Sequence, residues 1–223
     1  MLTQRLLEIS LIGAEWVLWL LVGLSVLSLW VVIDRLILFL RTRERLSELE
    51  PALIAALARC DLTEARRLVS RDSMVRNVVR AGLDTLSSGR SDPTVAEQAM
   101  LGALARERDR YDAHLPLLGT IGNNAPFVGL FGTILGIIQA FHQLGQLDAT
   151  QAAGNTVVMT AIAEALIATG VGILVAIPAV AAFNWAKSSI ASRTKGAESM
   201  MRAVLSGIGR FECVESEASG PKV

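Results

Sequence analysis

No lysine or arginine occurs anywhere in residues 113–186, about one third of this 223-residue chain. Asp148 and Glu164 are the only acids in the same block. Soluble proteins carry charged residues at about a quarter of all positions, so this long apolar block excludes an ordinary soluble globule. A mean hydropathy of +0.47 and a hydrophobic content of 52% agree with that exclusion. The sequence therefore predicts a membrane protein.

Three stretches of the sequence are long and apolar enough to cross a bilayer. Residues 16–33 carry no charge and would form about 27 Å of helix, against a hydrocarbon core of about 30 Å. The polar residues 143–154 divide the uncharged block into a second stretch over 116–141 and a third over 157–185. A cleaved signal peptide is the alternative for the first stretch, but neither a basic cluster before it nor a small-residue cleavage site after it is present.

The distribution of basic residues predicts how these spans are oriented. Arg35, Arg41 and Arg43 follow the first span, and Lys187 and Arg193 follow the third. Segments rich in lysine and arginine stay on the cytoplasmic side of a membrane. The N-terminus and the 143–154 segment are therefore expected outside, and the charged segment between the first two spans and the C-terminal tail are expected inside.

The charged segment between the first two spans is predicted to be helical. Pro51 is expected to open one helix in its first turn. Asp61 and Glu64 resemble a capping box at the start of a second helix. Asp92-Pro93 is expected to start a further helix that runs without a break into the second span. The third span is likewise expected to continue inward, so the prediction is an all-α membrane protein whose long helices extend into a cytoplasmic bundle.

Small residues recur at helical spacing in the second and third spans. Helices associate in lipid through small residues that let their backbones approach, because the hydrophobic effect does not act between them there. The pattern predicts that these two spans pack closely and are buried in an assembly, while the first span faces lipid. The residues expected at the packed faces are Gly129, Gly132 and Gly136 of the second span and Ala161, Ala165, Ala168 and Gly172 of the third.

Glu164 lies inside the otherwise apolar third span. A carboxylate within a bilayer is costly unless it is neutralised, paired or hydrated, which makes such a residue a candidate functional site. Neither later span contains a base, so Glu164 must be protonated, face water or meet a partner chain; a solvated position at the outer interface is the alternative. Thr133 and Thr169 add hydroxyl groups that are able to hold water or relay protons, although each could simply bond to its own helix.

Enzymatic chemistry has little support in this sequence. His114 and His142 stand alone, without further metal ligands at suitable spacing, and packing or interfacial roles are expected for both. No phosphate-binding loop, nucleophile elbow or zinc motif occurs. A membrane enzyme using Glu164 and His142 would need more converging groups than the spans offer. No catalytic residue, metal or cofactor is predicted, and no basic stripe indicates nucleic acid as a partner.

The segments GNNAPFVGLFGTILGIIQAF and IAEALIATGVGILVAIPAVAAFN resemble the signature of the ExbB/TolQ/MotA proton-channel superfamily, and ExbB and TolQ most of all. The resemblance implies a multi-pass protein of the bacterial inner membrane that forms a homopentamer around a dimer of a single-span, ExbD/TolR-like protein. The membrane aspartate of that partner would carry the proton, and a TonB/TolA-like protein would be a further partner. Glu164, Thr133 and Thr169 match the positions that line the pore in this family.

The function implied by the resemblance is that of a proton-channel subunit in an energy-transducing motor. Proton flow would be converted into mechanical work for TonB-dependent import, Tol-type envelope maintenance or gliding motility. A non-conducting scaffold that positions a partner helix is the alternative. The expected organisation is a periplasmic N-terminus and first transmembrane helix over 1–33, a cytoplasmic insert over 34–114, a second transmembrane helix over 115–142, a periplasmic loop over 143–156, a third transmembrane helix over 157–186 and a cytoplasmic helix and tail over 187–223.

Overall fold

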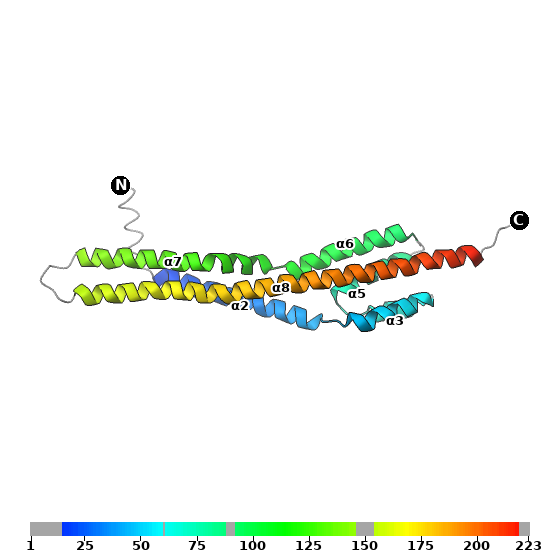
Figure 1. The fold of residues 1–223 in the computed structure, drawn as a ribbon, viewed down its shortest axis with the longest axis horizontal. Helices are drawn as coiled ribbons and strands as arrows, with labels where there is room; N and C mark the ends of the chain where they lie inside the picture. Colours follow the sequence, from blue (N-terminus) through cyan, green and yellow to red (C-terminus); the bar gives the residue numbers. More distant parts are fainter. Residues whose placement is uncertain (1–14, 60, 88–91, 146–153, 219–223) are drawn as a thin grey trace. The chain divides into compact units, whose positions relative to one another are not determined.

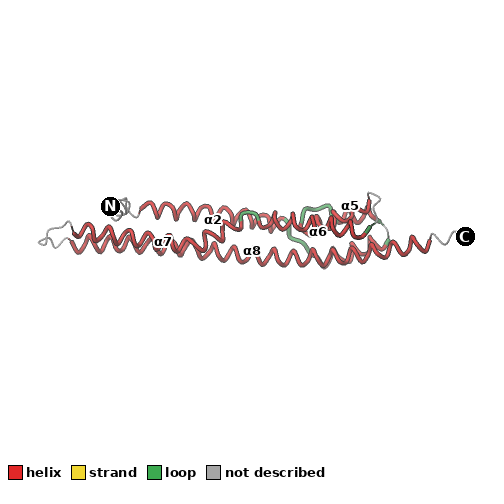
Figure 2. The backbone as a smooth tube through the Cα atoms, turned by 90° about the horizontal axis from the view of Figure 1, so that it is seen from above, coloured by secondary structure: helices red, strands yellow, loops and turns green. Residues whose placement is uncertain are grey.

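The computed structural model of the protein describes residues 15–59, 61–87, 92–145 and 154–218. Within these ranges the chain forms helices joined by short loops, without strands (Figure 2). The all-α prediction is therefore confirmed. The helices are α2 (Glu15–Arg41), α3 (Leu46–Ala58), α4 (Leu62–Leu68), α5 (Met74–Ser87), α6 (Pro93–Asp112), α7 (Leu115–Gly145) and α8 (Gly154–Ala218).

Three helical stretches of the described chain, which contain α2, α7 and α8, are long and apolar enough to cross a membrane. The chain divides into two compact units, one made of residues 1–34 and 114–185 and the other of residues 35–113 and 186–223. The helices described in the first unit all belong to these three apolar stretches. Most of the predicted 143–156 loop lies outside the described residues.

In the first unit, α7 and the 154–185 part of α8 run side by side in opposite directions (Figure 1). The beginning of α2 packs on this helical pair: Val17 is fully buried, and the rings of Trp16 and Phe131 meet edge to face with their centres 6.2 Å apart. The other side of α2 stays apolar and exposed, with Trp19 at 75% and Trp30 at 53%. Such a face suits a lipid environment, where no hydrophobic penalty opposes its exposure.

The boundary between α6 and α7 corrects one prediction. A single helix was expected to run from Pro93 into the second span, but α6 ends at Asp112 and α7 begins at Leu115. His114 separates them with φ of 64°, a left-handed conformation that a right-handed helix cannot include. The carbonyl group of His114 accepts a hydrogen bond from the Leu117 amide at 3.1 Å and so opens the new helix.

The second unit contains the end of α2 from residue 35 onward, α3 to α6 and the C-terminal part of α8. Two helix starts predicted from the sequence are confirmed. Asp61 accepts a hydrogen bond from the Glu64 amide at 2.9 Å at the start of α4, and Asp92 accepts one from the Thr94 amide at 2.8 Å at the start of α6. Carboxylates at these positions satisfy amides that have no partner within the helix.

The predicted role of Pro51 is wrong. Helix α3 begins at Leu46, and Pro51 lies inside it instead of in its first turn. The Arg45 carbonyl group already accepts hydrogen bonds from the Glu48 and Leu49 amides, so the helix is established before the proline is reached. Proline has no amide to donate to the carbonyl group four residues before it, and α3 continues past that missing bond to Ala58.

Charged side chains join the segment before α5 to α6 at the surface of this unit. Arg110 donates to the two carboxylate oxygens of Asp72 at 2.8 and 2.6 Å, and Asn77 donates to the same carboxylate at 2.8 Å. The hydrogen bonds from Arg110 and then from Asn77 lower the pKa of Asp72 to about 2. The carboxylate in turn raises the pKa of Arg110.

Candidate functional site

The seam between α7 and α8 brings the small residues of the two spans against each other. A Cβ atom added to Gly136 would lie 2.6 Å from the Cβ of Ala165 and 3.8 Å from the carbonyl oxygen of Ala161. One added to Gly132 would lie 2.9 Å from the Cβ of Ala168. Both distances to a Cβ are shorter than real side chains tolerate, so glycine is required for this approach.

Further along the seam, the main chains of α7 and α8 are in direct contact. A Cβ atom on Gly129 would lie 2.7 Å from the carbonyl oxygen of Ala168 and 3.0 Å from the Cα of Thr169. A Cβ atom on Gly172 would lie 2.7 Å from the carbonyl oxygen of Ala125. Main-chain atoms cannot rotate away as a side chain can, so Gly129 and Gly172 fix how closely the two helices approach.

Thr133 and Thr169 meet in this seam, and their hydroxyl oxygens are hydrogen-bonded to each other. The Thr133 hydroxyl also lies 3.2 Å from the carbonyl oxygens of Gly129 and Ala165, and the Thr169 hydroxyl lies 3.3 Å from that of Gly129. Each hydroxyl group has one proton to donate, so only some of these bonds form at once. The pair can therefore hold its two protons in more than one arrangement.

Glu164 lies five residues before Thr169 on α8 but does not join the hydroxyl pair. Its side chain is exposed, whereas the neighbouring Ala165 is fully buried in the seam. Five residues along a helix amount to about 140° around the axis, which places Glu164 on a different face of α8 from Thr169. Within the described residues, the Glu164 carboxylate makes no hydrogen bond and no ion pair.

A single chain thus brings two of the three predicted pore residues together and leaves the third on an outer face. The region around the carboxylate is apolar: Leu166, Ile167 and Met159 are exposed at 56–69%. No group of three or more histidine, cysteine, aspartate or glutamate side chains in the described parts of the chain is placed to hold a metal ion. The arrangement therefore presents a carboxylate, a group that can exchange protons, on an apolar helical face.

At the other end of the first unit, His114 has partners that its sequence context did not reveal. Its Nδ1 atom lies 3.4 Å from the carboxylate of Asp34, and its ring centre lies 5.5 Å from that of Trp30. Both contacts join the start of α7 to the end of the apolar part of α2. Neither contact could be anticipated, because 80 residues separate His114 from Asp34.

Comparison with known proteins gives a family for this arrangement. The MotA/TolQ/ExbB proton channel family matches residues 70–199, which include Thr133, Glu164 and Thr169. The Tol-Pal system protein TolQ of Pseudomonas aeruginosa is 42% identical over 121 residues, which make up 51% of each chain. The biopolymer transport protein ExbB of Xanthomonas campestris is 44% identical over 89 residues, 40% of this chain and 34% of that one.

A third relative covers a shorter segment. The putative biopolymer transport protein ExbB-like 2 of Helicobacter pylori is 47% identical over 70 residues, 31% of this chain and 45% of that one. The matched segments therefore span about half of the TolQ chain and less of the two others. The family match covers more than half of the present chain. With its three apolar helical stretches, this protein is a membrane protein that belongs to the MotA/TolQ/ExbB proton channel family.

Proposed function

We propose that this protein is the proton-channel subunit of an energy-transducing motor in the bacterial inner membrane. Five copies would surround a dimer of a single-span partner of the ExbD/TolR type, with a TonB/TolA-like protein receiving the work. The observation that carries the proposal is the exposed carboxylate of Glu164 on an apolar helical pair, without a counter-charge among the described residues. Such a group needs water, a proton or a second polypeptide within the membrane.

The free energy released by proton transfer limits how the Glu164 carboxylate could contribute to work. A proton crossing the membrane releases about 2.3 kcal/mol per 100 mV of membrane potential, so useful work requires many coupled transfers. In the proposed cycle Glu164 accepts and releases protons at the face shared with the partner. Thr133 and Thr169 provide a separate pair of hydroxyl groups in the seam, whose protons can be rearranged without breaking the helices. The partner supplies the second titratable group of the path.

The topology proposed for this function keeps the N-terminus and the 143–156 segment in the periplasm. The 34–114 and 187–223 segments are cytoplasmic, as the basic residues after the first and third spans indicate. The 1–33, 115–142 and 157–186 segments contain the three transmembrane helices. Relatives named for the Tol-Pal system and for biopolymer transport support envelope maintenance or import as the process that receives the work.

Substitution of Glu164 in cells that also contain the partner tests the proposal. Glu164→Ala and Glu164→Gln should each abolish proton-dependent output, while the amount of assembled complex stays close to that of the parent protein. Glu198→Ala, which removes an acid from the C-terminal part of the same helix, is the matched control and should leave output unchanged. Full output from Glu164→Ala would reject the channel in favour of a non-conducting scaffold that positions a partner helix.

A second measurement addresses the need for a partner. Purified protein reconstituted alone into vesicles should conduct protons poorly, and addition of the single-span partner should raise the flux. The flux is measured with a pH-sensitive dye under an imposed membrane potential. Strong conduction by the protein alone, without the partner, would contradict a path made from two components.

A further inference from the structure

The last turn of α2 is completed by an arginine from a distant part of the chain. Arg193 of α8 donates through Nη2 to the Phe39 carbonyl oxygen at 2.8 Å. Through Nη1 it donates to the Thr42 carbonyl oxygen at 3.0 Å and to the Thr42 hydroxyl at 2.7 Å. Carbonyl groups in the last turn of a helix have no partner within that helix. Arg193 therefore acts as a C-terminal cap supplied by another helix.

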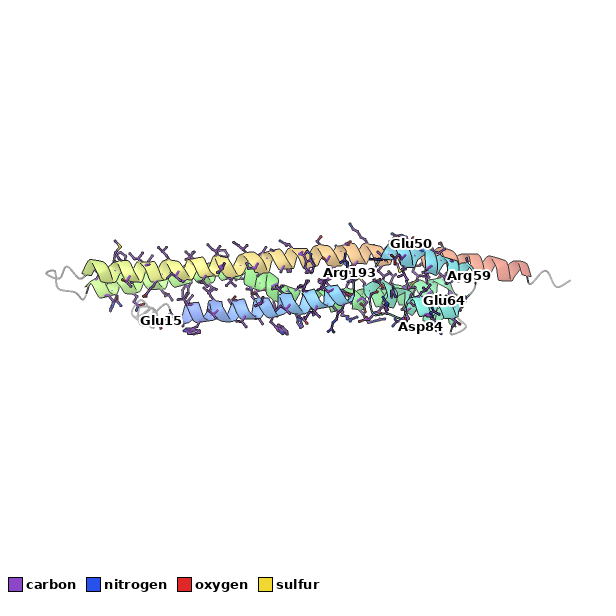
Figure 3. All side chains as sticks on the ribbon, turned by 90° about the horizontal axis from the view of Figure 1, so that it is seen from below. Glu15, Glu50, Arg59, Glu64, Asp84 and Arg193 are labelled. Carbon is purple, nitrogen blue, oxygen red and sulfur yellow. The ribbon has the colours of Figure 1, made fainter. Side chains whose placement is uncertain are left out.

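Two aromatic rings hold the same guanidinium in place. Its central carbon lies 4.8 Å from the centre of the Phe39 ring and 5.4 Å from that of the Tyr111 ring, and the two ring centres are 5.7 Å apart. Phe39 is 3% exposed and Tyr111 is fully buried. A cation over a desolvated aromatic face is attracted by the ring quadrupole. Arg193 thus joins α2, α6 and α8 within the second unit, where Figure 3 labels it.

The positive charge of Arg193 is stabilised by uncharged groups, without a carboxylate. In the described part of the chain it forms no ion pair, and its partners are two carbonyl groups, the hydroxyl groups of Thr42 and Tyr111, and the two rings. Lysine cannot replace this arrangement, because an ammonium group lacks the planar fork that reaches several acceptors while it stacks on a ring. The requirement at position 193 is therefore for the shape of the guanidinium as well as for its charge.

We propose that Arg193 is a positioning residue, which ties the end of α2 to α8 so that a displacement of α8 at this level carries the end of α2 with it. The role deepens the proposed channel function and rests on it, since α8 is also the helix that carries Glu164 and Thr169. Arg193 itself touches neither of the predicted pore threonines and handles no proton. Its loss should impair the coupled output of the assembly without removing the titratable group.

Hydrogen–deuterium exchange of the full-length protein measures how strongly Arg193 protects the end of α2. In Arg193→Lys the amides of residues 40–43 should exchange roughly tenfold faster, as expected when charge-assisted hydrogen bonds that protect a helix end are lost. Arg202→Lys changes an exposed arginine of the same helix and should leave this exchange unchanged. Tyr111→Phe should behave like the parent protein, because it keeps the ring and removes only a hydroxyl at 3.5 Å from Nη1.

Proton-dependent output with the partner present is measured on the same variants. Arg193→Lys should assemble normally and lose most of its output, and Arg202→Lys should keep it. Thr42→Val removes the hydroxyl group that accepts a hydrogen bond from Arg193 and changes no residue of α8. It should produce a smaller loss of output than Arg193→Lys, and it tests the proposal even where Arg193→Lys fails to fold. Faster exchange with full output would overturn the positioning role, and so would lost output with unchanged exchange.

The Glu164→Ala variant separates this inference from the function on which it rests. When Glu164→Ala abolishes output but neither Arg193→Lys nor Thr42→Val changes it, the positioning role fails and the channel stands. When Glu164→Ala retains full output, the channel function itself fails, whatever the exchange measurement gives. The two failures are therefore distinguishable in one set of strains.

Discussion

Thr133 and Thr169 share the Gly129 carbonyl oxygen as a hydrogen-bond acceptor, at 3.2 and 3.3 Å. Thr133 lies on α7 together with Gly129, whereas Thr169 lies on α8, so the bond from Thr169 crosses the seam and the bond from Thr133 stays within its own helix. The same carbonyl group lies four residues before Thr133 and has a helical amide as a further partner. Removal of either hydroxyl therefore leaves the Gly129 oxygen satisfied. The two hydroxyls are dispensable for folding in a way that the glycines are not.

Thr133→Val and Thr169→Val should each lower proton-dependent output by roughly an order of magnitude or more, the scale on which lost proton-transfer groups act. Valine keeps the branched shape of threonine, so the melting temperature of the purified complex should change by only a few degrees. Thr133→Ser retains the hydroxyl and should keep most of the output. Proton flux and thermal unfolding are measured on the same preparation; equal flux in the valine and serine variants would argue against a proton role for the pair.

Gly129→Ala should destabilise the protein by about 1–3 kcal/mol, as overpacking of a close contact does. The added methyl group would meet the carbonyl oxygen of Ala168 at 2.7 Å, and main-chain atoms cannot turn aside. Gly170→Ala is the matched control on the facing helix, because nothing lies within 4 Å of its added Cβ. Thermal unfolding in detergent compares the two, and an unchanged melting temperature for Gly129→Ala would contradict the close seam.

Acid should weaken the bond between Asp72 and Arg110. The folded-state pKa of Asp72, about 2, lies below the unfolded value of 3.8, so its stabilising contribution is complete above about pH 4 and is lost as the pH falls through about 2. Because the Asp72 side chain is 58% exposed, the contribution is expected to stay below about 1 kcal/mol. The stability difference between the parent protein and Asp72→Asn should shrink over this range, and a constant difference would refute the assignment.

Asp92→Ala should cost about 1 kcal/mol of stability, since it removes the acceptor for the Thr94 amide at the start of α6. Asp92→Asn keeps an oxygen in the same position and should cost much less. Chemical unfolding of the two variants gives the comparison. A similar loss for alanine and asparagine would mean that the carboxylate charge matters, and that the hydrogen bond to the amide does not.

Apolar runs and glycine spacing were enough to predict the three long helices and the residues that meet in their seam, because both depend on local sequence. The break at His114 was missed, since a positive φ at a histidine leaves no mark in a sequence that reads as helical on both sides. Pro116, in the first turn of α7, was the available signal. The cap formed by Arg193 joins groups more than 150 residues apart, and no spacing rule reaches that far.

The contacts at Gly129 and Gly172 also limit how the protein can change shape. With carbonyl oxygens of one helix set against the bare Cα atoms of the other, neither helix can slide or turn against its neighbour without a collision. The two helices must therefore move together as one rigid pair. In the proposed channel, any rearrangement would then be confined to the outer surfaces of this helical pair, and Glu164 lies on one of them.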